Sequence, residues 1–194
     1  MLLDISPMKI AMKTLLSLAL LMLSVALAGC GPKWVVVKQA TPNPMTATSK
    51  FKVDAPTFDP NFHVGNKTEA EWMGEKKAET KDKWDGDKVA MIEKFTDGFM
   101  AEKENILVST AAGAGIFGVR TKYVQYDPGY YIGISSAPTT LEADVDFLDS
   151  TGNVVDSIRI HTKNSGFSAG EGARRCATEI GQIAAKYLKQ RVGL

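Results

Sequence analysis

The chain has 194 residues, with 23 lysines and arginines, 22 aspartates and glutamates, two histidines and two cysteines. This near balance of charge excludes the strong basic excess that nucleic-acid-binding proteins commonly carry, and the total gives no support for electrostatic binding to anionic lipids or acidic polymers. The length suffices for one domain with a sizeable core.

The N-terminal segment has the layout of a secretory signal peptide. Lys9 and Lys13 precede an apolar run from Leu15 to Ala28 that only two serines interrupt. A basic start followed by a short apolar run is typical of a cleaved signal. The run is too short for an uncleaved membrane span, which needs about 20 apolar residues.

The apolar run ends in Leu27-Ala28-Gly29-Cys30, which resembles the lipobox of bacterial lipoproteins. The resemblance implies that residues 1–29 are removed and that lipid is attached to the Cys30 thiol. Two or more acyl chains on one cysteine anchor a protein stably. In Gram-negative lipoproteins an aspartate after the cysteine often retains the protein at the inner membrane, so Gly31 favours the outer membrane, facing the periplasm. An ordinary signal peptide with a small-residue cleavage site is the alternative interpretation.

Removal of residues 1–29 leaves 21 basic and 21 acidic residues, because Lys9, Lys13 and Asp4 are lost. Once Cys30 is acylated, Cys176 is the one remaining thiol, so the mature domain has no intramolecular disulfide.

Residues 30–49 are expected to form a tether with one short strand, Trp34 to Val37, and residues 50–194 a single α+β domain. Phe51 to Phe58 alternates apolar and polar residues, which predicts a strand. We expect an edge strand or a hairpin here, because Pro56 and Pro60 confine pairing to an edge.

Good helix formers dominate residues 68–104 and predict two helices, about 68–81 and 87–103, with a break near Trp84 to Asp87. The second helix should pack on a sheet through one apolar stripe, because its large apolar residues recur at helical spacing. These residues are Val89, Ile92, Phe95 and Phe99.

Strands are expected next at 106–109 and 119–125, followed by a turn at Asp127-Pro128-Gly129. Residues 141–147 then alternate strictly and, after a turn at 149–153, a return strand follows. This pattern predicts a hairpin with one buried face and one exposed face. The residues expected to be buried are Leu141, Ala143, Val145 and Phe147 on the first strand, and Val154, Ile158 and Ile160 on the second.

The last predicted element is a helix at about 171–190. Its apolar residues form an unbroken stripe that contains Cys176, so we expect this cysteine in the core rather than in a redox or metal site. Ser168 and Glu171 have the spacing of a capping box.

Gly113 to Gly118 matches the G-x-G-x-x-G pattern of dinucleotide-binding loops. That function needs a helix directly after the loop and an acidic residue about 20 positions later. The residues that follow, Val119 to Gln125, have β character instead. We therefore interpret this segment as a loop and expect no cofactor.

Gly166 to Gly170 matches G-x-S-x-G, and its serine, Ser168, stands between a predicted strand and a predicted helix, as in a nucleophile elbow. No histidine or aspartate follows Ser168, and both histidines, His63 and His161, precede it. We interpret Ser168 as a helix N-cap and keep a serine hydrolase that uses Ser168 as the third function hypothesis.

We expect no metal site and no catalytic residues. Asp85-Gly86-Asp87 suggests a calcium loop, but the first and twelfth ligand positions would be Lys81 and Ile92. Two distant histidines and one core cysteine do not make a zinc site. Three acidic residues share the exposed face of one strand, where a solvated surface is preferred over weak cation binding: Glu142, Asp144 and Asp146.

Four tyrosines surround the predicted turn at 127–129: Tyr123, Tyr126, Tyr130 and Tyr131. Exposed tyrosines suit a protein interface. Alternatively, they cover the sheet.

The C-terminal half, about residues 105–190, resembles a group of uncharacterised bacterial envelope lipoproteins. The shared pattern is a strand, the turn at 149–155, a second strand, a glycine-rich link and a terminal helix that ends with Ile183 to Leu188. This half is also distantly similar to the small α/β domains of the curli-export lipoprotein family and of the TolB N-terminal domain. These resemblances imply a role in envelope assembly or transport without catalysis, and they carry over no functional residue besides Cys30.

These patterns predict an α+β fold, a mostly antiparallel sheet with two amphipathic helices packed on it, after a signal peptide and a short tether. The expected function is a membrane-anchored, non-enzymatic scaffold or accessory subunit of a cell-envelope complex. Its partners would be the membrane, through lipidated Cys30, and an envelope protein, but no nucleic acid. The second hypothesis is a lipoprotein that binds a small molecule or polysaccharide in a pocket.

Overall fold

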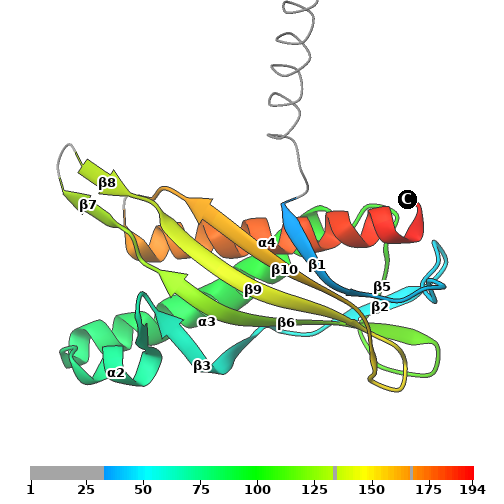
Figure 1. The fold of residues 1–194 in the computed structure, drawn as a ribbon, viewed down its shortest axis with the longest axis horizontal. Helices are drawn as coiled ribbons and strands as arrows, with labels where there is room; N and C mark the ends of the chain where they lie inside the picture. Colours follow the sequence, from blue (N-terminus) through cyan, green and yellow to red (C-terminus); the bar gives the residue numbers. More distant parts are fainter. Residues whose placement is uncertain (1–32, 133–134, 167) are drawn as a thin grey trace, which may run out of the picture. The chain divides into compact units, whose positions relative to one another are not determined.

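The structure is a computed structural model that describes residues 33–132, 135–166 and 168–194. The expected signal peptide and Cys30 lie outside the described residues. These residues form a mostly antiparallel sheet with helices packed on it, which confirms the predicted α+β class (Figure 1). Within the described ranges, no helix is long and apolar enough to cross a membrane.

In chain order the elements are β1 (Trp34–Gln39), β2 (Lys50–Val53), β3 (Thr57–Val64), β4 (Lys67–Thr68), α2 (Glu69–Gly74), α3 (Ala78–Ala101), β5 (Leu107–Ser109), β6 (Ile116–Asp127), β7 (Tyr130–Ile132), β8 (Ser135–Ala137), β9 (Thr139–Leu148), β10 (Val154–Asn164) and α4 (Ala169–Val192).

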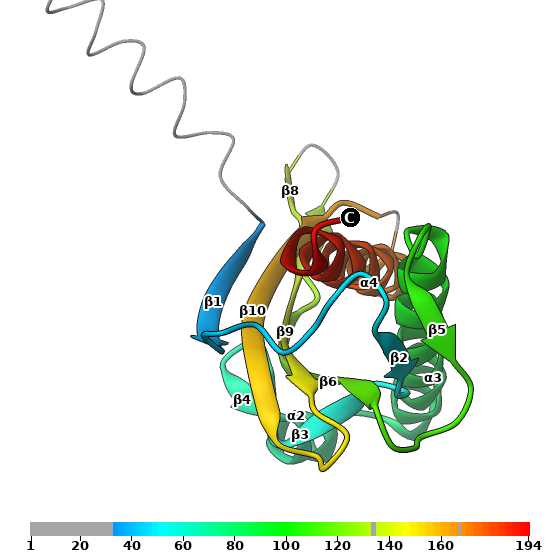
Figure 2. The ribbon, with the colours of Figure 1, turned by 90° about the vertical axis from the view of Figure 1, so that its right-hand side faces the viewer.

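The main sheet is antiparallel at one side and parallel at the other. Strands β1, β10, β9 and β6 follow one another in this order, each antiparallel to its neighbour. The far edge of β6 pairs in parallel with β2 near its start and with β3 near its end. β5 extends the sheet beyond β2, β4 pairs with β3, and β7 and β8 form a separate hairpin. The sheet curves around α3 and α4, which lie on the same side of it (Figure 2).

The β9–β10 hairpin lies within the antiparallel part of the sheet, as the alternation of its sequence predicts. The predicted inward-facing side chains of β9 are fully buried, and so are Ile158 and Ile160 of β10. The prediction for Val154 is wrong, because this residue is only half-buried. A register shift between Val154 and Asp156 at the start of β10 accounts for the difference and places Asp156 in the core.

Helix α4 buries every residue of the predicted stripe. It begins after the N-cap Ser168 and ends at Gly193, whose φ of 79° is a left-handed conformation that glycine adopts without strain. The buried stripe residues are Ala173, Cys176, Ala177, Ile180, Ile183, Ala184, Tyr187 and Leu188.

The helical region before β5 divides at a different point from the predicted one. The break lies at residues 75–77, and α3 runs without interruption through Trp84 to Asp87. Burial of Trp84 explains this continuity. Its ring stacks on Tyr126 with a centroid distance of 5.2 Å, and its indole N–H donates to Glu69 Oε1 at 2.7 Å. This tertiary packing overrides the weak helix propensity of the local sequence.

The predicted apolar stripe of α3 is only partly correct. Phe95 and Phe99 are fully buried, but Val89 is 57% exposed and Ile92 is half-buried. The buried face is rotated because α3 packs chiefly against α4 rather than flat on the sheet.

The backbones of α3 and α4 touch at two glycines. A Cβ on Gly98 would lie 2.1 Å from the Thr178 carbonyl oxygen of α4. A Cβ on Gly181 would lie 2.1 Å from the Phe95 carbonyl oxygen of α3. Since no real Cβ approaches a backbone oxygen this closely, only glycine at both positions permits the observed separation of the helices.

The stretch Phe51 to Phe58 forms neither a single edge strand nor a hairpin of two paired strands, so that prediction is wrong. It divides into β2 and β3, and β2 lies inside the sheet between β5 and β6. Pro56 falls in the division, and Pro60 falls where the pairing of β3 with β6 is interrupted, between Phe58 and His63. Both prolines thus occupy gaps in the ladder, where their missing N–H costs nothing.

Residues 34–49, assigned from the sequence to a tether with a short strand, pack against the domain. β1 extends the sheet beyond β10, and Met45 is buried in the core. Asn43 Nδ2 donates to the Arg191 carbonyl at 2.7 Å, which ties this segment to the end of α4.

A buried carboxylate strengthens the same connection. Asp156 has no exposed surface, and its Oδ2 accepts hydrogen bonds from the Tyr187 hydroxyl at 2.8 Å and from Arg191 Nε at 2.6 Å. Its Oδ1 accepts from the Ala40 N–H at 2.9 Å, and Arg191 also donates to the Ala40 carbonyl. The Asp156 carboxylate raises the pKa of Arg191, and burial raises the pKa of Tyr187 to about 12. The network therefore holds the β1 segment, β10 and α4 together.

Gly181→Ala is expected to destabilise the protein by about 1–3 kcal/mol, the usual cost of overpacking, because the new methyl group must displace the Phe95 carbonyl. Gly86→Ala is the matched control, since Gly86 lies inside α3 with nothing within 4 Å of its Cβ position. This control should stabilise the protein by about 0.5–1 kcal/mol. Urea unfolding measures both changes. A Gly181→Ala protein as stable as the wild type would contradict the backbone contact.

Asp156→Ala is expected to cost about 3–5 kcal/mol, because it leaves the guanidinium of Arg191 without its buried partner. The Arg191 side chain is only 16% exposed, so solvent cannot fully replace the carboxylate. Asp97→Ala is the control. It removes an exposed pair with Lys94 and should change stability by less than about 1 kcal/mol. Similar unfolding midpoints for the two variants would exclude a structural role for the Asp156 network.

Candidate functional site

A pocket of about 490 Å³ lies near the start of α4, beside the turn after β6 and the beginning of β9. This volume falls in the range of small-molecule sites. The half-exposed side chain of Tyr130 contributes to its wall. Its polar lining residues are Thr139, Ser165, Ser168 and Arg175.

The polar groups of this pocket are already engaged within the protein. The Thr139 hydroxyl donates to the Pro128 carbonyl at 3.0 Å. The Arg175 guanidinium donates to the Ser165 carbonyl at 3.1 Å and to Glu171 Oε1 at 2.6 Å. A specific ligand site usually presents polar groups that converge on the ligand, whereas the Thr139 hydroxyl and the Arg175 guanidinium donate to partners within the chain.

Ser168 lies at the N-cap of α4, as predicted, and its Oγ accepts a hydrogen bond from the Glu171 N–H at 3.2 Å. The glycines around it serve close packing. A Cβ on Gly170 would lie 2.4 Å from Asp87 Oδ1, and a Cβ on Gly166 would lie 2.6 Å from the Gly172 nitrogen. The N-cap role of Ser168 and the close packing at Gly166 and Gly170 therefore explain the G-x-S-x-G pattern at the start of α4.

A serine hydrolase needs a base beside the serine. In the described part of the chain no histidine is hydrogen-bonded to Ser168. His161 Nδ1 lies 3.0 Å from Glu142 Oε1, and His63 pairs with Thr68 in the short β3–β4 ladder. The structure thus brings neither histidine to the serine.

The glycine segment Gly113 to Gly118 leads directly into a strand, as the sequence predicts. Gly115 has a φ of 73°, which forms the turn, and Ile116 already begins β6. A Cβ on Gly118 would lie 3.2 Å from Leu148 Cδ1. The segment therefore has none of the helix N-terminal geometry that holds a pyrophosphate.

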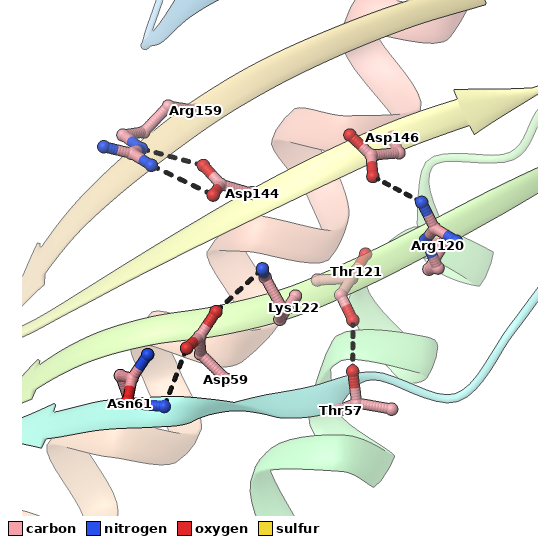
Figure 3. A network of polar contacts seen from close by, with 9 residues as sticks. All are labelled: Thr57, Asp59, Asn61, Arg120, Thr121, Lys122, Asp144, Asp146 and Arg159. Atoms are coloured by element: carbon pink, nitrogen blue, oxygen red, sulfur yellow. Dashed lines mark hydrogen bonds and ion pairs between the residues drawn. The ribbon is translucent and has the colours of Figure 1, made fainter. Parts of the chain in front are cut away.

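The outer face of the sheet, which is turned away from α3 and α4, carries ion pairs between neighbouring strands (Figure 3). Asp144 accepts two hydrogen bonds from Arg159, at 2.8 and 3.0 Å. Asp146 pairs with Arg120 at 2.9 Å and accepts a hydrogen bond from the Ser157 hydroxyl at 2.8 Å.

Two further acidic residues on the same face also have partners on neighbouring strands. Glu142 faces His161, and Lys122 Nζ lies 2.7 Å from Asp59 Oδ2 and lowers the pKa of that carboxyl. Asp59, Asp144 and Asp146 thus each pair with a lysine or arginine of a neighbouring strand. The described residues contain no group of three or more His, Cys, Asp or Glu side chains placed to hold a metal ion. We interpret this face as a solvated lattice of ion pairs, each contributing little to stability.

The tyrosines around the 127–129 turn do not form one surface. Tyr123 and Tyr126 are core residues whose hydroxyls donate to the Met91 and Ala169 carbonyls at 3.1 and 3.2 Å. Burial raises the pKa of both phenols. Tyr130 is 52% exposed, and the side chain of Tyr131 lies outside the described residues. The cluster therefore covers the sheet at least in part.

Cys176 is a core residue, as predicted. Its side chain has no exposed surface, and its Sγ donates to the Thr139 carbonyl at 3.5 Å. Burial raises the pKa of the thiol, which disfavours the reactive thiolate.

The most unusual surface feature is the valine edge, which we define as Val35, Val36 and Val37 of β1. These side chains are 68%, 46% and 63% exposed. In the described residues only seven large hydrophobic side chains are this exposed, and three of them are consecutive along this one edge strand, although Val35 and Val36 point to opposite faces of the sheet. β1 is the terminal strand of the sheet and pairs with β10 alone. Trp34 fixes its start by packing edge-to-face on Tyr187, with ring centroids 5.6 Å apart.

A strand was expected at 34–37, but its valines were not singled out. The signal was a run of three valines that begins five residues after Cys30. A short apolar run usually indicates a strand buried on both faces, so exposure of the run follows only from its place at the end of the sheet.

No protein-family model matches the chain, and no curated protein sequence is significantly similar to it. Among solved structures it is similar to the PelC dodecamer from Paraburkholderia phytofirmans, with 10% identity, a TM-score of 0.40, and coverage of 77% of this chain and 97% of that chain. It is also similar to the hypothetical protein CT253 from Chlamydia trachomatis, with 10% identity, a TM-score of 0.41, and coverage of 75% and 99%. Similarity at this level carries no information on function.

Ser168→Ala is expected to destabilise the protein by about 1 kcal/mol through loss of the N-cap. Ser168→Asp should retain wild-type stability, because aspartate caps equally well and suits the positive end of the helix. Thermal unfolding of the two variants tests the cap. If both variants melted with the wild type, Ser168 would not cap the helix, and its role would have to be sought in the pocket.

Proposed function

We propose that the protein is a membrane-anchored lipoprotein, held by lipid on Cys30, that acts as a non-enzymatic scaffold or accessory subunit of a cell-envelope complex. The observation that carries this proposal is the short distance along the chain between the anchor and the fold. Only Gly31, Pro32 and Lys33 separate Cys30 from Trp34, the first residue of β1.

This connection keeps the domain close to its anchor. A fully extended chain spans at most about 3.6 Å per residue, so the Trp34 Cα lies within about 14 Å of the Cys30 Cα. β1 itself is held by β10 and, through the following residues, by the Asp156 network. A domain on so short a connection cannot move far from the membrane that holds Cys30. A fixed position suits a subunit of an assembly better than it suits a protein that captures distant ligands.

Two further observations support the same class of function. The valine edge is the kind of exposed apolar surface that marks a contact with another protein or with a membrane. The C-terminal half resembles envelope lipoproteins whose relatives act in assembly or transport. In a Gram-negative host, Gly31 favours the outer membrane with the domain facing the periplasm.

The pocket beside α4 supports a second candidate function, the binding of a small molecule or polysaccharide. Its volume of about 490 Å³ is adequate. We rank this function below the first because the hydroxyl of Thr139 and the guanidinium of Arg175 already have partners within the chain.

Mild crosslinking in cells, detergent extraction and mass spectrometry test the proposal with wild type, Cys30→Ser and Gly31→Ala. Wild type and Gly31→Ala should yield an acylated N-terminal peptide and the same recurring envelope partner. Cys30→Ser should lose both the acyl groups and the partner while keeping its circular dichroism spectrum. An unmodified Cys30 in the wild type would refute the anchor. An acylated Cys30 without any partner would favour the pocket instead.

A further inference from the structure

We infer that the valine edge lies against the lipid headgroups of the membrane that holds Cys30. This inference rests on the proposed acylation of Cys30 and adds the orientation of the domain to it. The chain length sets the first condition. Val35 follows Cys30 by five residues, so its Cα lies within about 18 Å of the lipidated residue. No other exposed apolar cluster in the described residues starts so near the anchor.

Charge around the valine edge favours an anionic surface. Residues 31–53 contain no aspartate or glutamate but four lysines, so residues 54–194 carry 21 acidic and 17 basic residues. Of the four lysines, Lys50 and Lys52 lie on β2, away from β1 in the sheet. The equal numbers of acidic and basic residues in the whole mature chain do not reveal this uneven distribution of charge along it. Two of the lysines, Lys33 and Lys38, flank the valine edge directly, and both are exposed. Lysines beside a membrane surface are attracted by anionic headgroups.

Both lysines remain available to headgroups despite their contacts in the protein. Lys33 pairs with Glu179 at 2.7 Å, but its side chain is 69% exposed. Lys38 donates to the Val154 carbonyl, an uncharged partner. The positive charge of Lys38 is therefore not neutralised by that contact.

The backbone of β1 excludes deep burial in the membrane. As the terminal strand, β1 has one edge without a neighbouring strand, and unpaired N–H and C=O groups are very costly in hydrocarbon. In the headgroup layer, water and lipid oxygens can satisfy them. Valine side chains at the level of the headgroups, with lysines on either side, therefore fit both the apolar and the polar requirements.

The same strand is poorly suited to a second β-strand as occupant. Its pairing with β10 shifts register between Val36 and Lys38. Such bulges, together with lysines, are devices by which edge strands avoid adding another strand. The geometry therefore favours a lipid surface over a second copy of this chain.

Fluorescence quenching in vesicles tests the inference with the full, acylated chain. Val35→Cys and the control Val89→Cys each carry one environment-sensitive fluorophore, at positions that are 68% and 57% exposed. Cys176 is buried and does not compete for the label. The vesicles contain phosphatidylethanolamine, phosphatidylglycerol and a lipid spin-labelled at its headgroup. The label at position 35 should lose much of its fluorescence, and the label at 89 should keep it.

The same vesicle experiment also tests the role of the two lysines and the acylation of Cys30. Lys33→Gln combined with Lys38→Gln should weaken the quenching at position 35 in these anionic vesicles. The mass of the N-terminal peptide shows whether Cys30 is acylated. Equal quenching at 35 and 89 on an acylated protein overturns the inference and leaves the anchor intact. An unacylated Cys30 overturns both. Disulfide-linked dimers of unlabelled Val35→Cys, with the label at 35 shielded from the quencher, would assign the edge to a second copy and also overturn the inference.

Discussion

The separation between α3 and α4 is the dimension on which the rest of the fold depends. Because Gly98 and Gly181 let the two backbones touch, the helices form one narrow layer that a single curved sheet can cover (Figure 2). β6 is hydrogen-bonded to both helices, through the Tyr123 hydroxyl to the Met91 carbonyl of α3 and through the Tyr126 hydroxyl to the Ala169 carbonyl of α4. A larger distance between α3 and α4 would break these hydrogen bonds. The two glycines therefore determine the position of the sheet on the helices.

Sequence predicted those parts of the fold whose packing repeats locally. The alternation of β9 and the stripe of α4 each identify an element together with its buried face. The continuity of α3 through Trp84 was not predictable, since it depends on Tyr126 and Glu69 in other elements. Asp156 was missed because a charged residue is normally exposed, and its partners Ala40 and Arg191 are 116 and 35 residues away. The parallel pairing of β2 and β3 with β6 also joins segments that are distant in the sequence.

The candidate site shows the same contrast between features that local sequence predicts and features that depend on distant residues. The resemblance of residues 27–30 to a lipobox is a local signal that needs no structure, and the lipobox and the acylation of Cys30 are both predictions. The G-x-S-x-G motif is equally local, but its glycines are required where Gly166 meets Gly172 and Gly170 meets Asp87. Close packing thus explains the glycines of this short motif, but only the structure identifies the residues that they contact. The valine edge is the reverse case, since its sequence is typical of a buried strand and its exposure results from the order of strands in the sheet.

The bond between Ala40 and Asp156 also has a consequence for how the protein is made. The two residues are 116 positions apart, so at a synthesis rate of about 5–20 residues per second the first strand waits roughly 6–23 s for its native neighbour. Throughout that interval three valines and a complete strand edge are available for wrong pairing. The first strand therefore reaches its native pairing only after β10, near the end of the chain, is also available.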